Sequence, residues 1–131
     1  LTVTGGDVGN GSDTGTGSSG GGIRSEGALN LSAVGVRGNR AVTGGGIEAE
    51  ARLAIECSTI GGNVTASDGG GMRFSDRAII VNSTISGNQV TGQNNGAAVN
   101  LAGGSARLTA INVTIANNRA ADPARGAVAG G

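Results

Sequence analysis

The fold is decided by a stretch that the chain repeats with changes. Residues 44–63 read GGGIEAEARLAIECSTIGGN, and residues 69–88 read GGGMRFSDRAIIVNSTISGN. A looser copy, GGGIRSEGALNLSAVGVRGN, occupies residues 20–39. Self-similarity at a period of about 20 to 50 residues is the sequence signature of repeat proteins, so the chain is best interpreted as a repeat array.

The repeat predicts short strands. In each copy a block such as RLAIECSTI, residues 52–60, alternates apolar and polar residues between clusters of glycine and asparagine. A unit this small cannot bury its own apolar face, whereas stacked units can. We therefore predict an all-β fold in a single domain over residues 1–131. It is a right-handed parallel β-helix (β-solenoid) of about five coils of 24–29 residues, with three short strands per coil.

Equivalent residues of successive coils stack in such a solenoid, at about 4.8 Å per coil. The apolar ones are expected to point inward, and the predicted inward ladder is Ile23, Leu29, Leu31, Val36, Ile47, Leu53, Ile55, Ile60, Met72, Ile80, Ile85, Val99, Leu108, Ile115 and Val128. Glycine and asparagine tolerate positive φ, so they are expected at turns. The predicted turn and asparagine ladder is Asn39, Asn63, Asn82, Asn88, Asn112 and Asn118.

The composition argues against an enzyme. Formal net charge is zero, which gives no attraction to nucleic acid or to an anionic membrane. The chain has no His, Trp or Tyr, so few groups remain for general acid–base chemistry. We expect no catalytic residue, no cofactor and no metal. The alternative is a paired-carboxylate glycosidase site on the face that Glu48 and Glu50 share, with Glu26 and Asp76 nearby.

One cysteine interrupts a polar column. Cys57 stands where the other blocks have Ala33, Asn82 and Asn112. Free cysteine is commonly buried and inert, so we expect a small buried residue. The alternative is a reactive thiol or a ligand.

Three arginines share the first position of the block: Arg52, Arg77 and Arg107. We expect an outward ladder that covers strand edges and pairs with nearby acidic residues. The alternative is a stripe that binds anions.

The least regular segment is a Gly/Ser-rich loop over residues 9–22. It contains Asn10 in an N-glycosylation sequon. Because a loop is accessible, Asn10 is the candidate glycosylation site, and we attribute the other sequons to the Asn, Ser and Thr that turns require.

The two ends show no capping pattern, although natural solenoids cap their terminal coils. Joined end to start, the sequence reads GAVAGGLTVTGGDVGN, which has the order of a repeat if Leu1 takes the position of Leu29. The candidate axial interface is therefore Leu1, Val3 and Val128. Stacked subunits would form an open filament, because a head-to-tail contact does not close.

The motif Gly45-Gly46-Ile47, its copy Gly70-Gly71-Met72 and the turn asparagines resemble those of right-handed parallel β-helix repeat surface proteins. The resemblance is to the polymorphic outer membrane protein and adhesin-like group within the pectate-lyase-like fold, and it covers residues 20–128. The phenylalanine of that group's motif is replaced by Thr-Ile in STISGN. The resemblance implies the solenoid fold, which also carries enzymes and phage tailspikes.

Together these patterns predict an extracellular or cell-surface structural module of a filament, sheath or adhesin stalk. Its expected partners are other copies stacked head to tail or flanking coils of a longer chain, and surface glycans are a further possibility. No nucleic acid and no membrane insertion are expected. The alternatives are a fragment of a pectate-lyase-like carbohydrate-active enzyme and a phage tailspike shaft.

Overall fold

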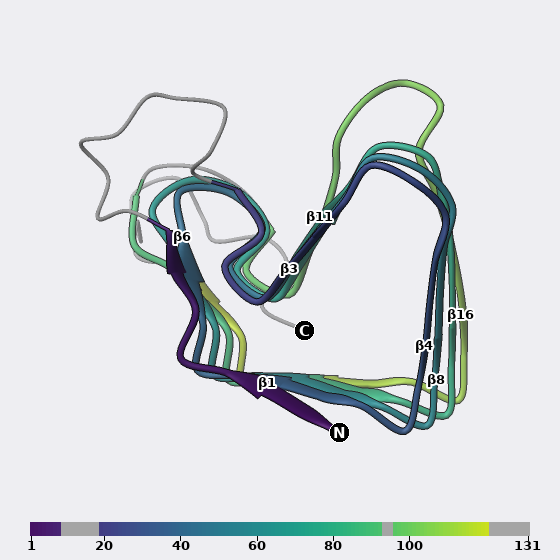
Figure 1. The fold of residues 1–131 in the computed structure, drawn as a ribbon, viewed down its shortest axis with the longest axis horizontal. Helices are drawn as coiled ribbons and strands as arrows, with labels where there is room; N and C mark the ends of the chain where they lie inside the picture. The colour runs from purple at the N-terminus through teal and green to yellow at the C-terminus, as the bar shows by residue number, and fades with distance from the viewer. Residues whose placement is uncertain (9–18, 93–95, 121–131) are drawn as a thin grey trace.

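The computed structural model describes residues 1–8, 19–92 and 96–120. Within these residues the protein contains strands and no helix. The chain winds through coils that follow nearly the same path, so that successive coils superimpose when viewed along the stack (Figure 1). Every pairing between strands is parallel and joins one coil to the next. The protein is thus an all-β stack of parallel strands, as the repeat predicted, and its right-handed winding stays a prediction.

Four sheets, named I to IV here, form the sides of the stack, and all of their strands run parallel. Sheet I consists of β3 (Ile23–Ser25), β7 (Ile47–Ala49), β11 (Met72–Phe74) and β15 (Val99–Leu101). Sheet II consists of β4 (Leu29–Ser32), β8 (Leu53–Glu56), β12 (Arg77–Val81) and β16 (Arg107–Ile111).

Sheets III and IV each have one strand more. Sheet III consists of β1 (Thr2–Thr4), β5 (Gly35–Arg37), β9 (Thr59–Gly61), β13 (Thr84–Ser86) and β17 (Thr114–Ala116). Sheet IV consists of β2 (Asp7–Val8), β6 (Arg40–Ala41), β10 (Val64–Thr65), β14 (Gln89–Val90) and β18 (Arg119–Ala120). The described residues thus complete four coils, β3–β6, β7–β10, β11–β14 and β15–β18, and β1 with β2 adds half a coil.

The prediction of three strands per coil was wrong, because each complete coil has four. The additional strand is the two-residue pair that follows each turn asparagine, such as Val64–Thr65 in β10. Two residues are too few to show a period-2 pattern, so the alternation of apolar and polar residues does not reveal this strand. Their pairing with the adjacent coils shows that they belong to a sheet.

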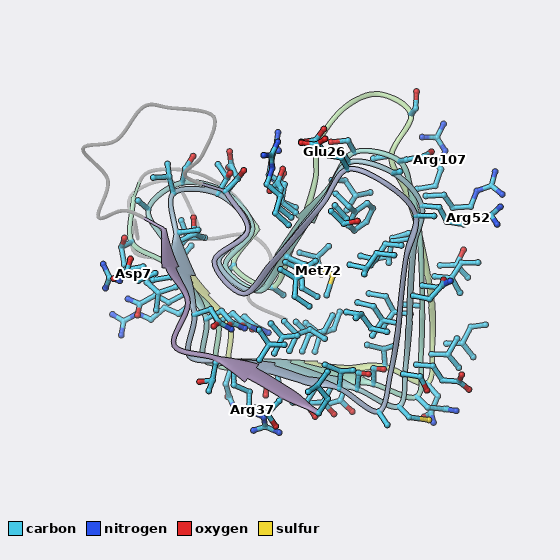
Figure 2. The ribbon with its side chains drawn as sticks, viewed as in Figure 1. Asp7, Glu26, Arg37, Arg52, Met72 and Arg107 are labelled. Atoms are coloured by element: carbon cyan, nitrogen blue, oxygen red, sulfur yellow. The ribbon has the colours of Figure 1, made fainter. Side chains whose placement is uncertain are left out.

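The core lies between the sheets, and its side chains stack in columns (Figure 2). One column joins Ile23, Ile47, Met72 and Val99 in register. The central members of the columns are fully buried, and the end members are half-buried but pack against the same cluster. All the predicted inward residues within the described ranges lie in this cluster. Val128 lies outside them.

Phe74, the one aromatic residue, was missed as a core residue. Phe74 is absent from the predicted inward ladder, but it pairs in register with Ala49, and its side chain is fully buried. An additional apolar column therefore runs through sheet I, two residues after the Ile47 column. Phe74 is adjacent to Arg73, which pairs with Glu48 in the outward row, and adjacent residues of a strand point to opposite faces.

Glycines shape the turn before sheet I, where each coil is indented (Figure 1). Gly20, Gly44, Gly69 and Gly96 all have positive φ, between +57° and +77°. A Cβ on Gly69 would lie 2.5 Å from the carbonyl oxygen of Met72, which is too close for any side chain. The repeated GGG motif therefore reflects both backbone conformation and close approach of neighbouring chain segments.

Part of the predicted loop over residues 9–22 is paired. Gly20 and Gly21 donate backbone hydrogen bonds to Thr43 and Gly44 of the next coil, over 3.0 and 3.2 Å. The segment that contains Gly20 and Gly21 therefore follows the path of the next coil, although its Gly/Ser-rich composition predicted a loop. Residues 9–18, including Asn10, lie outside the described residues.

The register at the first residue corrects the predicted axial join. Gly35 donates its backbone N–H to the carbonyl oxygen of Leu1 over 2.8 Å, and Thr2 pairs with Gly35. Leu1 therefore lies opposite Val34 and not opposite Leu29, the position that the join requires.

In the part of the chain that the structure describes, no helix is long and apolar enough to cross a membrane.

Candidate functional site

The most continuous polar feature is a ladder of buried asparagines between sheets III and IV. Asn39, Asn63, Asn88 and Asn118 are 1, 0, 0 and 7 % exposed. Each Nδ2 donates to Oδ1 of the asparagine in the next coil, over 3.1 Å from Asn39, 3.0 Å from Asn63 and 2.9 Å from Asn88. Each backbone N–H of the same three residues donates to the same oxygen over 3.0 Å. We call these four residues the asparagine ladder.

The second hydrogen of each Nδ2 is also bonded. It is donated to a backbone carbonyl oxygen of the preceding coil, for example from Asn63 to Val36 over 3.0 Å and from Asn88 to Ile60 over 3.1 Å. Asn39, Asn63 and Asn88 therefore each tie their own coil to both neighbours. A buried polar group is costly unless it is bonded, and here a complete network meets that requirement.

The predicted set of turn asparagines divides into two separate columns. Asn82 and Asn112 are exposed and lie at the corner between sheets II and III, outside the asparagine ladder. Nδ2 of Asn112 donates to Oδ1 of Asn82 over 2.8 Å. Both residues have positive φ, 47° and 52°, and so do Ala33 and Cys57 in the same column. The residues of this column therefore share the positive φ of a turn and not a buried position.

Cys57 was expected to be buried, and this expectation was wrong, because the side chain is exposed. The sequence pattern placed Cys57 inside the strand, although its φ of 48° marks the left-handed turn that follows β8. It is a single cysteine, with nothing in its surroundings that assigns it a reaction.

A shorter serine ladder was missed. Val34 and Ser58 donate their backbone N–H groups to Oγ of Ser58 and Ser83 respectively, each over 3.1 Å. The two hydroxyls in turn donate to the carbonyl oxygens of Glu56 and Val81, each over 2.7 Å. The signal was present in the sequence as the shared Ser-Thr-Ile of the two best copies, but serine suits turns as well as ladders.

A row of charged residues crosses sheet I: Arg24, Glu48 and Arg73 pair in register, and Asn100 continues the row. Glu48 is only 2 % exposed and forms an ion pair with Arg73. Its other oxygen, Oε2, is buried without a hydrogen-bond partner. Burial raises the pKa of Glu48, and the neighbouring Arg73 opposes this shift.

In the alternative of a paired-carboxylate site, the three glutamates are bonded to arginines, whereas Asp76 is exposed. Arg24 forms ion pairs with Glu50 over 2.8 Å and with Glu26 over 3.3 Å, and Glu48 is held by Arg73. Each glutamate of the proposed pair is thus bonded to an arginine, as in a structural ion-pair network. Among the described residues, no three His, Cys, Asp or Glu side chains gather in a way that could hold a metal ion.

The three stacked arginines are exposed, and Arg52 and Arg107 point away from the core (Figure 2). Arg107 donates to the backbone carbonyl oxygens of Gly104 and Ala106 over 3.1 and 2.9 Å. The expected pairing with acidic side chains was wrong, because in the described ranges the ion pairs of arginine involve Arg24 and Arg73 alone.

The outer face of sheet II carries a shallow hollow of about 400 Å³ with a mainly apolar surface. Ala54, Ile79 and Val81 line it, and Asn30, Ser32 and Glu56 add polar groups. Among these lining residues Glu56 is the single titratable group.

Comparison with known proteins identifies no relative. No family model, no curated protein and no solved structure matches this chain. The resemblance to surface β-helix proteins therefore stays a prediction.

Proposed function

We propose that this chain is a structural β-solenoid module of an extracellular or cell-surface protein, acting as a rigid spacer in a filament, sheath or adhesin stalk. The observation that carries the proposal is the asparagine ladder, which bonds each complete coil to the next through buried side chains. Its partners are other solenoid coils. The location outside the cell rests on the resemblance of the GGGI and STISGN motifs to surface proteins.

A spacer has to hold its two ends at a constant separation. In a repeat protein each coil contacts only its neighbours, so stiffness depends on every coil interface. Here each interface between complete coils combines four strand pairings with the apolar columns and the asparagine ladder. On the outer surface, Arg24 forms ion pairs with Glu26 and Glu50, as suits a solvated surface.

Distance measurement by double electron–electron resonance tests the proposal. Spin labels are attached at Thr2→Cys and Thr114→Cys, both exposed, in a background with Cys57→Ala. Ala33 adopts the same turn conformation as Cys57, so the background change is tolerated. The labelled strands are the two edges of sheet III, four strand spacings apart, which gives about 19 Å between backbones.

We expect one narrow distance distribution, and a broader one when Asn63→Ala is added to the same labelled protein. A broad distribution without that change would contradict a rigid spacer. Cleavage of an acidic polysaccharide by the purified chain would contradict a purely structural function and would favour the alternative of a carbohydrate-active enzyme.

A further inference from the structure

We infer that the last strand of each sheet, β15, β16, β17 and β18, together forms a docking edge for one more solenoid coil, and that this coil must present an asparagine in register with Asn118. These four strands are called the C-terminal edge below. The inference rests on the proposed function and specifies the partner: a coil chosen by an amide side chain at one position.

The asparagine ladder has a direction. Each of Asn39, Asn63 and Asn88 donates two hydrogen bonds to Oδ1 of the following asparagine. The ladder is closed at its first member, because the backbone N–H of Gly6 donates to Oδ1 of Asn39 over 2.9 Å. Gly6 occupies the ladder position of the first half-coil, since its neighbour Asp7 pairs with Arg40.

The ladder is open at its last member. Oδ1 of Asn118 accepts both bonds from Asn88, as in the other coils. Nδ2 donates to Ile85 over 3.0 Å, but its second bond turns back to Ala116 of the same coil over 3.1 Å. In the described part of the chain no acceptor faces the backbone N–H of Asn118, although this residue is only 7 % exposed. Both donors that an additional asparagine would engage are thus present at this edge.

The last side chains of the apolar columns are only half-buried at the C-terminal edge. Ile85 is fully buried, whereas Ile115, which stacks on it, is half-buried. Leu108 is likewise half-buried beside the fully buried Ala78. Another coil would cover these side chains in the way that each coil already covers its neighbour, so the edge continues an interface that the structure repeats.

The required amide excludes two candidate occupants. A second copy of this chain, stacked in the same direction, would bring Gly6 to the ladder position, where it offers no side-chain acceptor. A Cβ on Gly6 would lie 1.8 Å from the carbonyl oxygen of Gly21, so no side chain fits there. Residues 121–131 contain no asparagine. The occupant is therefore a solenoid coil that carries an asparagine at the ladder position and is neither a second copy of this chain nor its residues 121–131.

Amide hydrogen exchange of Asn118 tests the inference. A copy of residues 69–92, one coil with its ladder asparagine, is appended to the full chain after Gly131. The matched control appends the same copy with Asn88→Ala. The additional length of the connecting segment adds little loop-closure cost. We expect the asparagine copy to slow exchange at Asn118 by about tenfold or more, and the alanine copy to leave it near the rate of the unmodified chain.

Three results would overturn the inference. Equal protection by both copies would show that the edge docks a coil without the amide, and no protection by either would show that the edge does not accept a coil. Protection in the unmodified chain that increases with its concentration would show that copies of the chain stack on one another. A narrow spin-label distribution alongside any of these results would leave the rigid spacer intact and reject the docking edge alone.

Discussion

At the scale of single residues, burial separates asparagines that the sequence makes look alike. Asn63 is fully buried and makes hydrogen bonds to both neighbouring coils, whereas Asn82 is exposed at a turn. Both stand in the sequon pattern Asn-X-Thr/Ser. The sequon therefore has no bearing on accessibility here, and Asn63 cannot be a glycosylation site in the folded protein.

Replacing Asn63 should be costly and replacing Asn82 should not. Asn63→Ala removes the acceptor for two donors of Asn39 and leaves buried groups unpaired, which costs about 3 kcal/mol of unfolding free energy. Asn82→Ala should cost less than about 1 kcal/mol, because Ala33 already occupies the equivalent left-handed position. Urea unfolding of both variants measures the difference. Equal losses would show that the asparagine ladder adds no more than an ordinary turn.

Glu48 makes the stability of the protein depend on pH. Burial raises the pKa of its carboxyl above the ordinary value of 4.5. The folded protein therefore binds this proton more tightly than the unfolded chain. The associated stability is fully present below about pH 4.5 and is lost as pH rises through the raised pKa.

We expect Glu48→Gln to remove this dependence. The unfolding free energy of the variant minus that of the parent should increase as pH rises from about 4 to 8, since only the parent ionises a buried group. Urea titrations at several pH values measure it. Glu26→Gln is the control, because the side chain of Glu26 is 72 % exposed. A difference that stays constant with pH would mean that Glu48 titrates normally.

At the scale of elements, the strands are short and the turns determine where they lie. All the strands in the described residues have two to five residues, too few to be stable in isolation. Positive φ at the glycines before sheet I reverses the chain at the same place in each coil. Differences in coil length are taken up by connections such as residues 102–106, which protrude in green in Figure 1.

Glycine at these turns should be irreplaceable, while glycine elsewhere should not. Gly69→Ala combines a φ of +70° with a 2.5 Å approach to Met72, and we expect a loss of about 2 kcal/mol or more. Gly27→Ala meets no atom within 4 Å and should change stability by less than about 1 kcal/mol in either direction. Thermal unfolding of the pair measures both. A tolerated Gly69→Ala would mean that the turn can rearrange.

At the scale of the whole molecule, a solenoid is nearly one-dimensional, and this property links its stability to its proposed function. Each coil is stabilised by its two neighbours, so the inner coils are fully covered and the outer ones are not. An exposed end is thus both the least stable part of the stack and the place where another coil can add. The asparagine ladder restricts which coil that is, because an unmatched amide donor would remain buried.

The repeat by itself predicted the stacked parallel strands and the inward apolar ladder within the described residues. Both predictions depend on the repeat period, which can be recognised although the residues differ between coils. It can be recognised because an inward position stays apolar and a turn position stays glycine or asparagine in most coils. The resemblance, the location and the spacer function are not decided by the period, since the same stacking physics serves many activities.

Three features were decided only by the tertiary structure: the fourth strand in each coil, the burial of Phe74 and the separation of the asparagines into two columns. In each case the local sequence suits both outcomes, and the pairing register with the next coil decides between them. A shift of one residue exchanges the inward and outward faces, and register depends on contacts with residues about 25 positions away. The period of the chain is a property of its sequence, whereas the register of its coils is a property of the packed stack.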